Sequence, residues 1–246
     1  TKIGAANVYI SALHNAARGY DIKDSGDTDP DGYERNGVTT GLSYQFTDAQ
    51  SGGLDLQMNK GNYQYDSSFG GDEADFDSRV ISAFYQLHTS RADLRLQGGR
   101  STDHSWNFGQ GISRSSADLF STQQDSINLT SLVRINQEHA VLVGADYRSS
   151  DVSDSDTTYT ETSVSTQGGY LGYRYHGENI QLETGSRYDD NEQYGDFWSF
   201  NTNAIFNFSN GDSLALGQAT AFRAPTFNEL YYPGYGNPDL NVERSR

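Results

Sequence analysis

The sequence has 246 residues, which is enough for one large all-β domain or two smaller domains. Aromatic residues make up 13% of the chain, too many for ordinary disorder, although hydrophobic residues reach only 34% and the mean hydropathy is -0.74. The net charge of -16 excludes nucleic acid as a natural partner, and the lack of cysteine excludes disulfides and thiolate metal sites.

Alternating polar and apolar residues recur along the chain and predict β-strands with one apolar face. In residues 54–59, for example, Leu54, Leu56 and Met58 alternate with polar residues. The same alternation returns in residues 179–188 and 213–223. No run of about 18 apolar residues is present, so no transmembrane helix is predicted, but this does not exclude a membrane β-barrel, whose strands only alternate.

Short polar turns alternate with long polar loops between the predicted strands. We expect short turns near residues 46–53, 88–93, 135–140, 175–180 and 208–213, and long loops at 18–37, 63–79, 103–120, 149–163 and 189–197. This rhythm predicts an up-and-down antiparallel sheet of about eleven strands of roughly ten residues each, as in outer-membrane barrels. A soluble β-sandwich or β-helix with one polar face is the alternative. Tyrosines near the strand ends favour a membrane barrel, with Tyr20, Tyr44, Tyr63, Tyr147, Tyr170, Tyr173 and Tyr188 as candidates for the interfacial girdle.

The segment 221–241 holds three of the four prolines of the chain, Pro225, Pro233 and Pro238. Proline cannot donate a hydrogen bond to a sheet ladder, so the stretch from Pro225 to Pro238 is predicted to be a rigid loop after a strand that ends at Phe222. Its tyrosines are expected to pack the loop or to expose a stacking surface.

The same segment resembles the barrel signature of TonB-dependent outer-membrane receptors. The resemblance lies in Ala219 to Thr226, Asn228 to Tyr231, Gly236 to Leu240, and Glu243, with Val242 where a proline is usual. It implies a transmembrane barrel of about 22 strands around a plug, with short periplasmic turns, long extracellular loops and outer-membrane lipid around it. Residues 1–246 are then expected to form about half of that barrel, without the plug and the C-terminal strands.

Within the family, residues 186–206 and 231–246 resemble the cobalamin-transporting members. This resemblance implies active uptake of cobalamin or a related corrinoid, driven by TonB through the plug, and no enzymatic activity. The sequence likewise lacks a zinc-protease HExxH motif and a hydrolase GxSxG motif. A siderophore receptor of the same family, a passive porin or surface adhesin, and a secreted carbohydrate-binding protein are the alternatives.

Acidic residues gather in the first two long loops. Calcium prefers about six to eight hard oxygen ligands, which two facing loops can supply, but solvated acidic loops are also common. The resemblance favours calcium, because cobalamin transporters order these loops with it. The predicted ligands are Asp21, Asp29, Asp31, Tyr65, Asp66 and Asp77, with Asp27, Asp72 and Asp75 nearby.

Trp106 and Asn107 are the candidate substrate-binding residues. Both are predicted to lie on the third long loop, where an indole ring can stack on a large planar ligand and an amide can hydrogen-bond to it. A tryptophan at this position can equally belong to the aromatic girdle or pack the loop.

Overall fold

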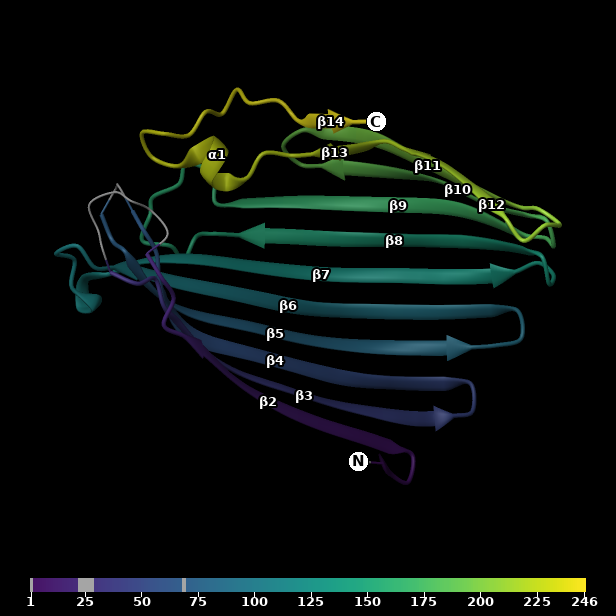
Figure 1. Ribbon diagram of the computed structural model, residues 1–246, viewed down its shortest axis with the longest axis horizontal. Helices are drawn as coiled ribbons and strands as arrows, with labels where there is room; N and C mark the ends of the chain where they lie inside the picture. The colour runs from purple at the N-terminus through teal and green to yellow at the C-terminus, as the bar shows by residue number, and fades with distance from the viewer. Residues whose placement is uncertain (1, 22–28, 68–69) are drawn as a thin grey trace.

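A computed structural model describes residues 2–21, 29–67 and 70–246. Its main feature is a 12-stranded antiparallel sheet in which the strands lie in chain order, as Figure 1 shows. The strands are β1 (Lys2–Ile3), β2 (Ala6–Ala17), β3 (Tyr33–Thr47), β4 (Gln50–Gln64), β5 (Glu73–His88), β6 (Ala92–Phe108), β7 (Asp118–Arg134), β8 (His139–Asp151), β9 (Ser163–His176), β10 (Ile180–Asn191), β11 (Gly195–Asn207) and β12 (Ser213–Ala219).

The predicted all-β, up-and-down architecture is confirmed, and the predicted eleven strands correspond to β2 to β12. Strands β2 to β11 have 12 to 17 residues, longer than predicted, because several loop ends continue the ladder. The turns at residues 48–49, 89–91, 135–138 and 177–179 lie together at one end of the sheet (Figure 1). The described parts of the long loops, at 18–21, 29–32, 65–67, 70–72, 109–117 and 152–162, lie at the other end. A short 3-10 helix, Arg114–Ser116, lies in the loop at 109–117.

The prediction of a long loop at residues 189–197 is wrong. Strands β10 and β11 pair as far as Asn191 and Gly195, and only residues 192–194 connect them. The Asn191 side-chain oxygen accepts hydrogen bonds from the backbone of Gln193 and Tyr194, and Gly195 has a positive φ of 73°. The polar composition of this segment thus serves a tight turn instead of a long loop.

The register of the ladder gives the sheet two different faces. Leu54 pairs with Leu42 and with Ala83, whereas its neighbour Asp55 pairs with Gly41 and Ser82. We call the face that carries Leu54 the outer face and the face that carries Asp55 the inner face. Exposed apolar side chains cover the outer face: Val8, Ile10, Val38, Leu42, Leu54, Ile81, Leu96, Ile127, Leu129, Val143, Leu171, Trp198, Phe200, Leu214 and Leu216.

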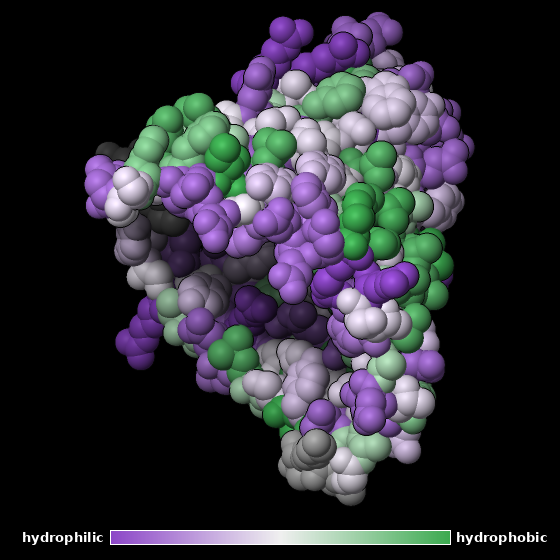
Figure 2. Space-filling view, turned by 90° about the vertical axis from the view of Figure 1, so that its right-hand side faces the viewer, coloured by the Kyte–Doolittle hydropathy of each residue, from purple (hydrophilic) through white to green (hydrophobic). Residues whose placement is uncertain are grey.

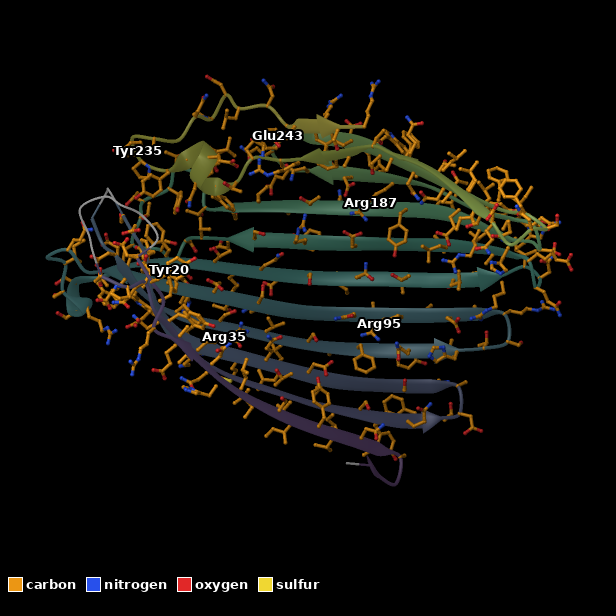
Figure 3. The ribbon with its side chains drawn as sticks, viewed as in Figure 1. Tyr20, Arg35, Arg95, Arg187, Tyr235 and Glu243 are labelled. Atoms are coloured by element: carbon orange, nitrogen blue, oxygen red, sulfur yellow. The ribbon has the colours of Figure 1, made fainter. Side chains whose placement is uncertain are left out.

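The inner face is polar and surrounds a hollow. Figure 2 looks from the short-turn end and shows this hollow with hydrophilic side chains within it. Arg35, Arg95 and Arg187 lie on this face, spread along the strands from the loop end toward the short turns, as Figure 3 shows. The curled sheet therefore has polar side chains on its inner face and apolar side chains on its outer face.

The described residues contain almost no conventional core. The buried hydrophobic residues are only Ala74, Phe108, Val152, Tyr159 and Leu230, and all of them lie at the loop end. Stability therefore depends on the backbone ladder and on an apolar environment for the outer face. None of the helices in the described ranges is long and apolar enough to cross a membrane.

The C-terminal segment leaves the main sheet after Ala219. Strand β13 (Ala221–Arg223) pairs with β14 (Glu243–Ser245) in a separate two-stranded sheet, and helix α1 (Phe227–Tyr231) lies between them in sequence. The predicted strand end at Phe222 is therefore wrong by three residues for the main sheet. The stretch from Pro225 to Pro238 contains no strand, as predicted. Its helix was not predicted from the sequence, because five residues are too few to show a helical periodicity.

Candidate functional site

Aromatic side chains line the inner face at the loop end of the sheet. Tyr33 pairs with Tyr63, and the rings of Tyr63 and Phe76 lie 6.1 Å apart. Tyr33 and Tyr63 remain 41% and 38% exposed, so their rings are available to a ligand inside the curl. Phe120 of β7 continues this surface, since it pairs with Ser105 in the same row as Phe76.

Gly61 leaves room for the Phe76 ring over the neighbouring strand. A Cβ at Gly61 would lie 2.8 Å from a carbon of that ring and 2.0 Å from the carbonyl oxygen of Glu34. No larger residue fits there without displacing backbone. The aromatic surface thus depends on one glycine in the neighbouring strand.

Helix α1 covers part of the inner face at the same end. Thr226 caps it by accepting a hydrogen bond from the backbone of Glu229, whose carboxylate accepts one from the backbone of Thr226 and two from Arg223. The Thr226 backbone and the Arg223 guanidinium hold the pKa of Glu229 at about 2, below its usual range. This capping box fixes a helix too short to be stable alone.

Aromatic contacts dock α1 onto the loop between β8 and β9 and onto β7. The Tyr159 hydroxyl donates to Asn228 Oδ1 at 2.5 Å, and its ring packs edge-on against Phe227 at 6.5 Å. Tyr232 stacks on Phe120 with ring centres 6.4 Å apart. Burial raises the pKa of the Tyr159 hydroxyl. The prediction that this segment's tyrosines pack the loop is confirmed for Tyr232, whereas Tyr235 is 80% exposed.

A cavity of about 510 Å³ lies between α1 and the inner face of β7, β8 and β9. We call it the roof cavity. Its walls combine aromatic rings with amide and hydroxyl groups. The residues used below are Phe120, Gln124, Arg148, Ser150, Tyr159 and Phe227.

Five of the six predicted calcium ligands lie on two adjacent loops. Asp21, Asp29 and Asp31 belong to the β2–β3 loop, and Tyr65 and Asp66 to the β4–β5 loop. The bases of these loops are joined, because Gln64 donates its backbone N–H to Gly32 and accepts the Gly32 N–H on its side chain. Asp27 lies outside the described residues.

Asp31 has an unsatisfied oxygen. Its Oδ2 atom is enclosed by protein and accepts no hydrogen bond, and Oδ2 of Asp66 is enclosed as well. A buried carboxylate oxygen without a donor costs free energy unless a cation or water meets it. In the described part of the chain, however, no three acidic or histidine residues come close enough together to form a metal site.

The predicted loop position of Asp77 is wrong. Asp77 lies within β5 on the outer face, where it pairs with Lys60 at 2.8 Å and with Arg79 at 2.6 Å. Two cations already neutralise this carboxylate. The acidic run 72–77 reads as loop in sequence, but the ladder continues through it from Glu73.

The predicted loop position of Trp106 and Asn107 is also wrong, because both lie in β6. Trp106 pairs with Asp75 and faces outward, where its ring packs against His104. Asn107 faces inward, and its side-chain oxygen accepts a hydrogen bond from the Tyr65 hydroxyl at 3.1 Å. Of this predicted pair, only Asn107 therefore lies on the aromatic surface.

Comparisons with known proteins agree with this architecture. A family model described as "TonB dependent receptor-like, beta-barrel" matches residues 3–246. The chain belongs to this family. Its members are receptors and transporters of the bacterial outer membrane, so the outer face contacts lipid and the inner face is the barrel lumen.

Relatives and solved structures of this family cover almost the whole chain. The chain is 26% identical over 226 residues to the vitamin B12 transporter BtuB of Photobacterium profundum and 25% identical to that of Vibrio vulnificus, covering 91% and 98% of this chain. It spans only 37% and 40% of the length of those relatives.

Among solved structures, the siderophore receptor PirA of Acinetobacter baumannii matches with a TM-score of 0.79 at 15% identity, over 98% of this chain and 44% of that one. PirA of Pseudomonas aeruginosa matches with a TM-score of 0.75 at 18% identity, over 99% of this chain and 44% of that one. At these identities the likeness shows the fold alone.

The roof cavity was not predicted from the sequence, and neither was a role for Arg148, the single cation among the described residues that line it. The alternation of residues 145–149 places Arg148 on the same face as Asp146, so its orientation was readable. The closeness of Arg148 to α1 was not readable, because Arg148 and Phe227, the first residue of α1, are about 80 residues apart in the chain.

Proposed function

We propose that this chain is the barrel wall of an active transporter for cobalamin or a related corrinoid. The observation that carries the proposal is the aromatic surface of Tyr33, Tyr63 and Phe76 beside Asn107 at the loop end of the lumen. Aromatic rings and amide groups suit a large planar ligand with amide side chains. The relatives named as vitamin B12 transporters support this choice of substrate.

Calcium is the proposed cofactor of the extracellular loops. The enclosed Oδ2 atom of Asp31 supports it, because a hard cation would satisfy this oxygen. Asp21, Asp29, Tyr65 and Asp66 would supply further oxygens. Bound calcium would neutralise the charges of the carboxylates and so reduce their mutual repulsion. The two loops, which are hydrogen-bonded at their bases, would then form an ordered surface before the substrate binds.

Transport would be driven by TonB acting on a plug supplied elsewhere in the whole protein. Within this chain, the polar lumen wall would bind the plug and the substrate, and the apolar outer face would anchor the barrel in the outer membrane. No covalent step is involved. A siderophore receptor is the second candidate, because solved siderophore receptors share this fold.

Calorimetric titration of the full-length receptor with cyanocobalamin, with and without calcium, tests the substrate. We expect tight binding that calcium strengthens. Binding of a ferric siderophore with no response to cyanocobalamin under either condition would instead establish the second candidate.

A triple variant tests the calcium ligands. Asp29→Asn, Asp31→Asn and Asp66→Asn together should abolish the effect of calcium on cyanocobalamin affinity. Asp154→Asn, in the β8–β9 loop, is the matched control and should retain it. An unchanged calcium effect in the triple variant would refute the proposed ligand set.

A further inference from the structure

Arg148 stands out among the lumen-facing cations. It lies on the inner face of β8, three residues before Asp151 ends the strand, and it lines the roof cavity. Within the described residues, its guanidinium takes part in no hydrogen bond and no ion pair. A guanidinium offers five donors in a planar fork, so all of them remain available to a ligand.

The other arginines on the inner face of the strands are all engaged by the wall itself. These contacts hold the guanidinium groups in place and occupy N–H donors that a ligand would otherwise bind. The contacts are Arg187 with Asp146 and Asp189, Arg174 with Glu183, Arg134 with Asp93, Arg35 with Asn59, and Arg95 with Gln97 and the Phe84 ring.

The roof cavity contains no counter-charge for Arg148. None of the described residues that line it is aspartate or glutamate, although acidic residues outnumber basic ones 33 to 17 in the chain. Gln124 and Ser150, which pair across β7 and β8, place an amide and a hydroxyl beside the guanidinium on the same wall. Aromatic rings of Phe120 and Phe227 also line the cavity and partly enclose it.

We infer that the roof cavity binds an anionic group of the substrate, with Arg148 as its direct partner and Gln124 and Ser150 as neutral donors. For a corrinoid this group is the phosphodiester of the nucleotide arm, and this identification rests on the proposed function. A guanidinium matches the two oxygens of a phosphodiester with parallel hydrogen bonds. Partial enclosure by aromatic rings strengthens that interaction relative to open water.

Titration of the full-length receptor with two corrinoids tests the inference. Cyanocobalamin carries the phosphodiester, and dicyanocobinamide has the same ring without it. We expect Arg148→Ala to weaken cyanocobalamin binding by at least about tenfold, the range for a hydrogen bond to a charged group, and to leave dicyanocobinamide binding unchanged. Arg148→Lys should recover part of the loss.

Arg95→Ala is the matched control, since Arg95 lies on the same face near the short-turn end, away from the cavity. An equal loss for both corrinoids in Arg148→Ala, or the same loss in Arg95→Ala, would overturn the inference. If the wild-type receptor binds neither corrinoid, the proposed substrate is wrong, and the same variants are titrated with ferric enterobactin, an anionic iron complex. A selective loss in Arg148→Ala then supports the anion site, and no loss, or no binding by the wild type, overturns it.

Discussion

Arg187 of β10 reaches across β9 and donates to both carboxylate oxygens of Asp146 in β8, at 2.7 and 2.9 Å. The same guanidinium also contacts Asp189, which is 4% exposed. Its path is open only because residue 168, in the intervening strand, is glycine: a Cβ there would lie 2.2 Å from Arg187 Nη2. Three strands of the lumen wall are thus tied by one side chain.

The ion pair between Arg187 and Asp146 should be weakened by Gly168→Ala and also by Asp146→Asn. Alanine displaces the guanidinium, and asparagine removes the charge that a bidentate contact requires. We expect a loss of about 1.5–3 kcal/mol, the range for a hydrogen bond to a charged group. Thermal unfolding of the detergent-solubilised barrel measures it. Gly172→Ala is the control, since a Cβ there meets nothing closer than 3.5 Å, and equal losses in all three variants would contradict this assignment.

Leu129→Arg and Asn128→Arg test the assignment of the two faces with consecutive residues of β7. Leu129 faces lipid, and an arginine within the bilayer costs about 2–4 kcal/mol at the midplane. Asn128 pairs with Asp146 on the lumen face, where a cation is tolerated. Assembly into outer-membrane fractions and thermal stability should fall only for Leu129→Arg. A larger loss of assembly and stability in Asn128→Arg than in Leu129→Arg would show that the lipid-facing and lumen-facing sides have been assigned the wrong way round.

Trp106 and Asn107 should differ in substrate binding, because they face opposite sides of β6. Asn107→Ala removes the acceptor of the Tyr65 hydroxyl and should weaken cyanocobalamin binding about two- to tenfold, the worth of one neutral hydrogen bond. Trp106→Ala should leave the affinity unchanged. Titration calorimetry on both variants measures the change in affinity. A larger loss of affinity in Trp106→Ala than in Asn107→Ala would contradict substrate binding on the inner face.

The capping box of α1 should resist acid. Because the pKa of Glu229 is lowered to about 2, its stabilising contribution is complete above its ordinary value of about 4.5 and is lost as the pH falls through about 2. Hydrogen exchange of residues 227–231 should therefore stay protected at pH 4 and rise toward pH 2. In Glu229→Gln this pH dependence should disappear, and its persistence would assign the effect to another group.

The fold class, the strand order and the assignment of side chains to the two faces could all be predicted from the amino-acid sequence. Each follows from local features of the chain. The alternation of polar and apolar residues determines which side chains share a face, and short turns make consecutive strands pair with each other. Leu54 and Asp55 were assigned to opposite faces correctly. The proline segment was correctly excluded from the sheet, because proline lacks the N–H that a ladder needs.

The ends of the strands and the contacts between distant segments became visible only in the folded chain. Polar segments are usually exposed to water, so the segments that contain Asp77, Trp106 and residues 189–197 were predicted to be loops. They form strands because the strands of the barrel extend beyond the apolar band into water. The roof cavity joins Arg148 to α1 from distant parts of the chain, and no local pattern records such a contact. The enclosure of the Asp31 carboxylate oxygen and the contact between Gly32 and Gln64 likewise depend on how the loops fold, which no local pattern records.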